Sequence, residues 1–147
     1  MALGDAILAA VVRADASKSV ASSSLGVGLE ATVARNRRIV GGPIDPTVSA
    51  IRVDTDGLLA ALVFRYACHP AALGPANTQV SAEYPRYVTR ATDAVYPGSI
   101  GLFLTGCAGQ LNTGHLERTF EEEARLGRAV AGAATQATEQ APKRTNS

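Results

Sequence analysis

The stretch Leu58–Pro75 constrains the fold most. It is a long apolar run that is interrupted abruptly by a Cys-His-Pro corner at residues 68–70. Residues 58–67 carry a single charge, Arg65, and include Val, Phe and Tyr, a composition typical of a strand buried on both faces. Pro70 cannot donate to a strand ladder and restricts the residue before it to extended geometry. His69 therefore lies where this strand leaves the core, a position at which α/β proteins place catalytic and metal-binding side chains.

A shorter apolar run at 100–104 predicts a second buried strand. It leads into small residues, whose backbone can approach another group closely. If the two strands pair in parallel, the corner at His69 and the corner at Gly106–Asn112 lie side by side and form one site. The polar groups expected there are those of His69, Ser81, Glu83, Tyr84, Gln110, Asn112 and His115.

Apolar periodicity predicts the remaining elements. Helices are expected at about 2–18, 81–95 and 119–139, the second with Ser81 as its N-cap. Strands are expected at 25–33 and 48–53. Residues 34–46 and 110–115 are expected to form loops. Asp56-Gly57 predicts an antiparallel hairpin of 48–54 with 58–67. The fold class is therefore α/β, a mixed sheet with packed helices, in a single partial domain at 1–139 followed by a disordered tail at 140–147.

Composition excludes several classes of protein. Fourteen basic against 13 acidic residues give a net charge of +1, which does not predict a nucleic-acid partner. No segment approaches the roughly 20 apolar residues of a membrane span. No export signal is readable near Met1, so localisation stays unknown, with the cytoplasm as the default. Cys68 and Cys107 are too few for a disulfide framework and are expected to be buried thiols.

Five short motifs follow one another in a recognisable order: Asn36–Arg38, Asp45-Pro46, His69-Pro70, Ser81–Pro85 and Ala108–Asn112. Their order and approximate spacing resemble the N-terminal catalytic domain of the neutral/alkaline (non-lysosomal) ceramidase family. The resemblance is greatest to bacterial ceramidase-like proteins of uncertain substrate. It covers about residues 25–135 and describes part of a larger catalytic domain.

The resemblance implies a zinc-dependent amidohydrolase that cleaves the N-acyl bond of ceramide or a similar lipid amide. His69 matches one of the zinc-binding histidines. Ser81, Glu83 and Tyr84 would then line the substrate pocket. The catalytic position of the family falls in the loop that contains Gly109 and Asn112.

The chain departs from the family pattern in that loop. Where the family has Gly-Asp-x-Ser-Pro-Asn, this sequence has Gly109-Gln-Leu-Asn-Thr-Gly114, with no serine nucleophile and with Thr113 as the one hydroxyl. By the resemblance, the family takes its other zinc ligands from segments that flank this one. The expected protein is therefore a truncated form. The alternative is a non-catalytic remnant or subunit that binds a second copy or a complementing chain supplying the missing segments.

Several residues have two interpretations from the sequence alone. His115 is a substitute metal ligand or a solvated loop residue, and a third hypothesis builds a different hydrolase from His69, His115 and Glu83. Glu83 either ligates the metal or orients a ligand, or it is simply stabilised by the dipole at the start of a helix. Arg37, the candidate substrate-binding arginine, and Arg38 hold an acidic group of the substrate or form a solvated surface pair. The acidic residues 121–123 are expected only to favour a helix start.

Overall fold

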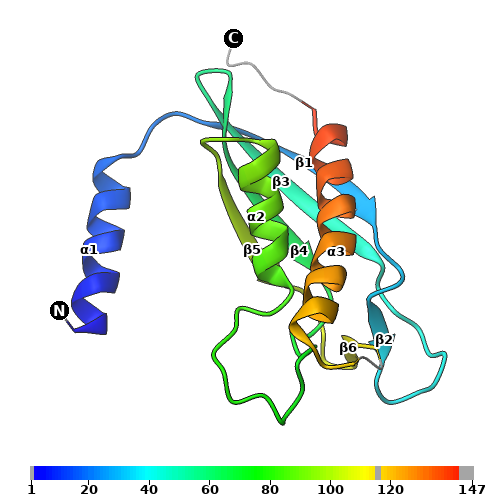
Figure 1. The fold of residues 1–147 in the computed structure, drawn as a ribbon. Coiled ribbons are helices and arrows are strands. Elements are labelled where there is room, and N and C mark those ends of the chain that lie inside the picture. Colours follow the sequence, from blue (N-terminus) through cyan, green and yellow to red (C-terminus); the bar gives the residue numbers. More distant parts are fainter. Residues whose placement is uncertain (1, 115–116, 143–147) are drawn as a thin grey trace.

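A computed structural model describes residues 2–114 and 117–142 (Figure 1). Met1, His115, Leu116 and residues 143–147 lie outside the described residues. Along the chain the elements are α1 (Leu3–Ala16), β1 (Ser22–Leu29), β2 (Ala34–Asn36), β3 (Thr47–Thr55), β4 (Leu58–Tyr66), α2 (Pro85–Val95), β5 (Ile100–Thr105), β6 (Leu111–Thr113) and α3 (Phe120–Gln140).

The main sheet is mixed, with the strand order β1-β3-β4-β5. Strands β1 and β4 are antiparallel to β3, and β5 is parallel to β4. The predicted hairpin is present as β3–β4. Asp56 and Gly57 turn it with φ of 52° and 77°, the positive values that a two-residue hairpin turn requires. The predicted α/β class with a mixed sheet is confirmed.

Helices α2 and α3 cover one face of this sheet (Figure 1). The core between them is built from alternate residues of β4, namely Leu62, Phe64 and Tyr66. Two glycines of β1 let α3 come unusually close. A Cβ on Gly26 would lie 1.7 Å from the carbonyl oxygen of Ala137, and one on Gly28 would lie 2.2 Å from that of Ala133. The small residues of strand and helix therefore fix the distance between the two layers.

The opposite face of the sheet is apolar and open among the described residues. Its large aliphatic side chains are between 43% and 67% exposed: Leu25, Val27, Leu29, Ile51, Ile100, Leu102 and Leu104. The expectation that 58–67 and 100–104 are buried on both faces is therefore wrong. In β4 fully buried residues alternate with half-buried ones, and β5 is an edge strand. The reason is that α2 and α3 pack on one side only.

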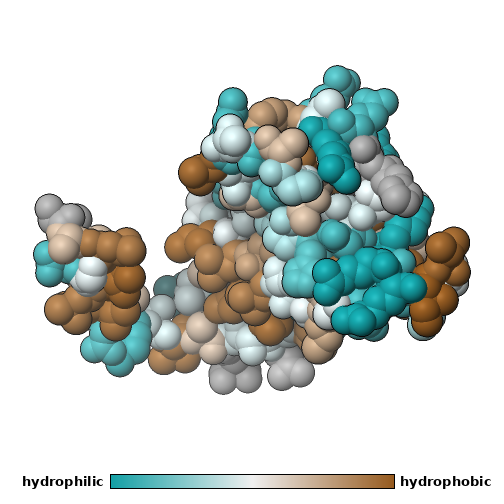
Figure 2. All heavy atoms as spheres, turned by 90° about the horizontal axis from the view of Figure 1, so that it is seen from below, coloured by the Kyte–Doolittle hydropathy of each residue, from teal (hydrophilic) through white to brown (hydrophobic). Residues whose placement is uncertain are grey.

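Helix α1 carries a second unpartnered apolar surface. It stands apart from the sheet (Figure 1), and none of its residues is buried. Its apolar side chains, Leu3, Ile7, Leu8, Val11 and Val12, are between 57% and 79% exposed. In Figure 2 they appear as the apolar group at the left. The amphipathic helix predicted at 2–18 thus forms, without a described partner for its apolar stripe.

A small second sheet joins two segments that the sequence predicted as loops. Strand β2 pairs antiparallel with β6, with Arg35 opposite Asn112. The amide of Arg37 extends the pairing by donating to the carbonyl oxygen of Gln110 at 2.8 Å. Three-residue strands are too short for periodicity to reveal, so the loop predictions for 34–46 and 110–115 need this correction.

The start of α2 also differs from the prediction. Tyr84, not Ser81, occupies the N-cap position, and no side chain caps the helix there. The Ser81 hydroxyl instead accepts a hydrogen bond from the amide of Glu83 at 2.9 Å. Glu83 has a φ of 55°, a left-handed conformation that breaks the helix before Pro85.

The remaining predictions concern the C-terminus, the membrane and the cysteines. Helix α3 ends at Gln140 and Ala141 is buried, while 143–147 of the expected tail lie outside the described residues. Among the described helices, none is long and apolar enough to cross a membrane. Cys68 is buried, and burial raises the pKa of its thiol to about 12. Cys107 is exposed, against expectation, because it follows an edge strand.

Candidate functional site

The corners that follow β4 and β5 lie side by side. Strands β4 and β5 pair in parallel from Ala61 opposite Ile100 to Tyr66 opposite Thr105. Beyond them, His69 forms a parallel bridge with Asn112, and its amide donates to the carbonyl oxygen of Leu111 at 3.2 Å. The parallel pairing on which the predicted site depends is therefore present, and it brings the two corners together.

His69 is exposed at this corner. Among the described residues, no three His, Cys, Asp or Glu side chains form a group that could hold a metal ion. The donor set described around His69 therefore does not fit a zinc site. His115, the substitute ligand considered from the sequence, lies outside the described residues.

Glu83 anchors the loop that follows His69. Its Oε2 accepts from the amide of Ala72 at 2.8 Å, and its Oε1 accepts from the amide of Leu73 at 3.2 Å. Both carboxylate oxygens are thus committed to backbone. This contact, rather than the helix dipole alone, explains a carboxylate at this position.

Tyr84 is fully buried beneath the same loop. Its hydroxyl donates to the carbonyl oxygen of Cys68 at 2.7 Å, and burial raises the pKa of that hydroxyl. The ring packs edge to face against Tyr66 and Phe103, with centroid distances of 6.4 and 5.6 Å. Tyr84 thereby fixes the backbone immediately before His69 from inside the core.

Ser81 connects this region to α3 through a buried carboxyl group. Its hydroxyl donates to Oε1 of Glu123 at 3.1 Å, and Glu123 is completely buried. Burial raises the pKa of Glu123, and Oε2 has no hydrogen-bond partner among the described residues. The expectation that Glu123 only provides helix-start charge is therefore wrong. The sequence gave no indication that Glu123, the last of three consecutive glutamates, faces the core.

Arg37 and Gly109 are in direct contact. The Nε and Nη2 atoms of Arg37 donate to the carbonyl oxygen of Gly109 at 3.2 and 3.0 Å. Gly109 itself is exposed, whereas Asn112 is half-buried in β6 and its Oδ1 accepts from the amide of Thr113 at 2.9 Å. The arginine motif after β2 and the glycine corner after β5 thus form one surface.

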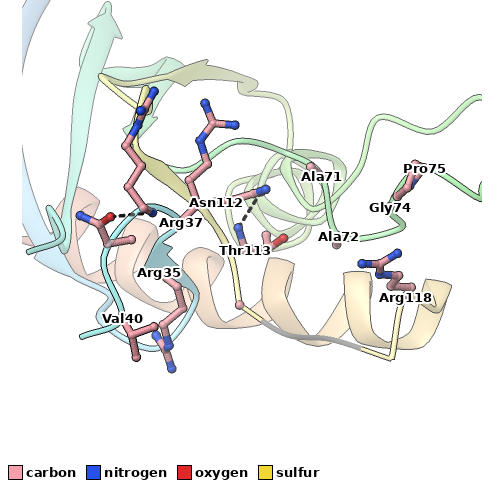
Figure 3. A pocket seen from close by; sticks show the side chains of 13 residues that line it. Arg35, Arg37, Val40, Ala71, Ala72, Gly74, Pro75, Asn112, Thr113 and Arg118 are labelled. Atoms are coloured by element: carbon pink, nitrogen blue, oxygen red, sulfur yellow. Dashed lines mark hydrogen bonds between the residues drawn. The ribbon is translucent and has the colours of Figure 1, made fainter. Parts of the chain in front are cut away.

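A pocket of about 450 Å³ opens on that surface (Figure 3). Four arginines line it: Arg35, Arg37, Arg38 and Arg118. The other lining residues are small, apolar or uncharged polar: Asn36, Val40, Ala71, Ala72, Gly74, Pro75, Asn112, Thr113 and Gly114. Arg118 lies beside Gly74 and Pro75, across the pocket from Arg35 and Arg37 (Figure 3). Sequence reasoning missed Arg35, which the pairing of β2 with β6 brings to the pocket, and Arg118, which lies against Gly74.

The predicted site residues therefore divide into two groups. Arg37 and Asn112 line the pocket, and His69 lies next to it in the chain, two residues before Ala71. Ser81, Glu83 and Tyr84 are held behind the loop, in contact with Glu123, the loop amides and the Cys68 carbonyl. The arrangement offers hydrogen-bond donors and positive charge to a ligand. Among the described residues, no side chain that could act as a general base forms a hydrogen bond with the hydroxyl of Thr113.

Comparison with solved structures defines the class of fold: the chain has the fold of one part of a bacterial neutral ceramidase. The chain is similar to the crystal structure of neutral ceramidase from Pseudomonas aeruginosa, with a TM-score of 0.79 and 21% identity over 92% of this chain. It is equally similar to a structure described as ceramidase complexed with C2, with a TM-score of 0.79 and 22% identity over 92% of this chain.

The chain spans 25% of the length of each of these structures. No protein-family model matches the sequence. No curated protein matches it either. At these identities the likeness establishes the fold, and it confirms the ceramidase resemblance at that level.

Proposed function

We propose that this chain is a portion of a ceramidase-like amidohydrolase that acts on the N-acyl bond of a lipid amide or a similar compound. The observation that carries the proposal is the bridge between His69 and Asn112. It joins the motif that resembles a zinc-ligand position to the loop that resembles the catalytic position, within a fold shared with neutral ceramidase. The pocket beside this bridge is accessible to a ligand.

In this proposal His69 supplies one zinc ligand, and the other ligands come from outside the described residues. The described residues offer no group of three ligands, whereas a catalytic zinc site normally has three protein ligands. Glu83 and Tyr84 act as positioning residues, because they hold the backbone on either side of His69. Gly109 and Asn112 form the wall of the site opposite His69, and Arg37 contacts substrate at its rim.

The proposal is tested by measuring metal content across the oligomeric fractions of the purified protein. Size-exclusion chromatography coupled to elemental analysis is expected to find zinc in oligomeric or complemented fractions and little in the monomer. His69→Ala is expected to remove that zinc, whereas Arg90→Ala, an exposed change on α2, leaves it in place. The same fractions are assayed with a fluorogenic N-acyl amide. Folded, zinc-free protein in every fraction contradicts the proposal.

A second candidate function is favoured by the open apolar face of the main sheet. Exposed aliphatic side chains gathered on one sheet face, here beside the ion pair of Arg65 with Asp45, are typical of a protein interface. The four strands, at about 4.8 Å spacing and about 3.3 Å per residue, present roughly 400–500 Å² of flat area, which on two partners approaches the roughly 1,000 Å² of a specific interface. The chain would then be a non-catalytic subunit that packs this face against the sheet of another copy or of a complementing chain.

Light scattering separates this candidate from a monomeric protein. Self-association is expected at micromolar concentration, and it should fall sharply in Leu102→Lys, which places a charge on the open face. Leu8→Lys on α1 is the matched control, since it charges the other apolar surface. If only Leu8→Lys disperses the oligomer, or if wild-type protein is a sharp monomer, the sheet face is not the interface.

A further inference from the structure

We infer that the pocket between β2, β6 and the loop 71–75 binds an anionic group, so that the compound accommodated here is an acidic N-acyl amide rather than a neutral one. The amide part of this statement rests on the proposed function. The anionic part rests on the pocket itself, on its arginines and on the absence of compensating carboxylates among its described residues.

Two of the arginines are held in place by main-chain carbonyl groups. Arg37 donates through Nε and Nη2 to Gly109, and Arg35 donates through Nη1 to Ala34 at 2.8 Å and to Ala31 at 3.3 Å. A guanidinium group carries five N–H donors. These contacts orient each group at the pocket and still leave donors for a ligand. Neutral carbonyl oxygens also leave the positive charge uncompensated.

The four pocket arginines have no carboxylate partner among the described residues, in contrast to three other arginines of the chain. Arg52, Arg65 and Arg125 each contact a carboxylate, at distances of 2.7, 3.1 and 2.7 Å. Within 2–114 and 117–142, none of the pocket arginines forms an ion pair, and none of the lining residues is acidic.

Glu83 lies behind the loop 71–75, and both its oxygens are engaged by the amides of Ala72 and Leu73. Glu117 precedes Arg118 in the chain, and it forms no ion pair with the pocket arginines within the described part of the chain. Like charges around one hollow repel each other, and an anion that enters it relieves this repulsion. Arginine also matches the planar, two-oxygen geometry of carboxylate and phosphate groups better than any other side chain. Charge and geometry therefore point to the same class of ligand.

The rest of the lining indicates what the anion is attached to. Val40, Ala71, Ala72 and Pro75 present apolar surface to the same hollow. A volume of about 450 Å³ lies within the range of about 300–1,000 Å³ that small-molecule pockets occupy. An acyl chain with an acidic head group satisfies both surfaces. An N-acyl amino acid has this form, and its carboxylate is two bonds from the amide nitrogen.

The test compares ligands that have hydrocarbon chains of the same length and differ in the head group. N-Dodecanoylglycine carries a carboxylate, and N-dodecanoylethanolamine replaces that carboxylate by a neutral hydroxymethyl group. Dodecyl phosphate provides the phosphate arm. Binding of each to the purified chain is measured by calorimetry below the micellar concentration, at low and at high salt. We expect N-dodecanoylglycine to bind at least tenfold more tightly than N-dodecanoylethanolamine, with the difference shrinking as salt rises. The two acidic arms tell carboxylate from phosphate.

The variant for this test is the double substitution Arg38→Gln and Arg118→Gln. Neither side chain donates a hydrogen bond to a described residue, so the fold should be retained, which circular dichroism checks. Arg13→Gln with Arg90→Gln removes the same charge elsewhere. We expect the pocket variant to lose the preference for the acidic ligand and the control to keep it. Equal affinity for charged and neutral ligands, or a preference that both variants retain, would overturn the inference.

This outcome is independent of the proposed hydrolysis. Salt-sensitive binding of the acidic amide by a zinc-free, inactive protein would contradict the hydrolase and leave the anion pocket standing. Hydrolysis of the glycine and ethanolamine compounds at equal rates, with equal affinity, would leave the hydrolase standing and overturn the anion pocket.

Discussion

The main-chain amide of His69 donates to the carbonyl oxygen of Leu111, a residue 42 positions later in the chain, at 3.2 Å. This hydrogen bond extends the parallel pairing of β4 with β5 past the end of both strands. It uses the backbone of His69 and leaves the imidazole exposed. The position of the corner is therefore set by the fold, and the side chain is available for chemistry.

His69→Ala is accordingly expected to change stability by less than about 0.5 kcal/mol, the effect of an ordinary exposed substitution. The alanine amide can make the same hydrogen bond to Leu111. Urea unfolding followed by circular dichroism measures the change. A loss of more than about 2 kcal/mol would mean that the imidazole supports the fold, and the loss of zinc in this variant would then not identify a ligand.

The contact of β1 with α3 gives a second prediction. In Gly26→Ala the new Cβ would overlap the carbonyl oxygen of Ala137, a backbone atom that cannot rotate away. We expect a loss of about 3 kcal/mol, at the upper end of overpacking effects. Gly132→Ala is the matched control: nothing lies within 4 Å of its Cβ, and alanine favours a helix over glycine by about 0.5–1 kcal/mol. The two variants should shift the unfolding midpoint in opposite directions.

Glu83 gives a prediction about the loop after His69. A glutamine at this position would keep one acceptor oxygen and turn an N–H donor toward one of the two loop amides. Glu83→Gln should therefore lower stability by about 1–3 kcal/mol and accelerate hydrogen exchange at Ala72 and Leu73. NMR-detected exchange measures the two amides directly. Asp93→Asn, an exposed change on α2, should leave both rates unchanged. Unaltered exchange in Glu83→Gln would mean that the carboxylate does not anchor the loop.

Sequence periodicity predicted the elements that are long enough to show it. The hairpin of β3 with β4 and the helices α1 and α3 follow from apolar spacing and from the Asp56-Gly57 turn. The open face could not be predicted in this way, because an apolar run such as 100–104 has the same composition whether a second layer covers it or not. Its exposure depends on which other elements are present.

The pocket was out of reach of sequence reasoning for a different reason. Arg35 and Arg118 are distant in the chain and line opposite sides of the pocket, and the pairing of the three-residue strands β2 and β6 places Arg35 there. The Asn36–Arg38 motif did indicate Arg37. Glu123 was missed because burial of one glutamate among three depends on the rotation of α3 about its axis, which Leu126 and Val130 fix by packing.

Glu123 also gives the pH dependence of stability. Burial raises the pKa of its carboxyl group, and Glu83 raises it further, whereas the Ser81 hydroxyl and Arg86 lower it. Since the folded-state pKa lies above that of the unfolded chain, its stabilising contribution is complete below the unfolded-chain pKa. That contribution is lost as the pH rises through the folded-state pKa.

Glu123→Gln removes this titration and keeps a side chain that can pair with Ser81. Urea midpoints measured from pH 4 to pH 8 should therefore differ little at pH 4, and the variant should gain on the order of 1 kcal/mol over wild type toward pH 8. Glu121→Gln, an exposed change in the same turn of α3, should follow the wild-type profile. A constant difference between Glu123→Gln and wild type across this range would show that Glu123 stays charged in the folded protein, with Arg86 compensating it.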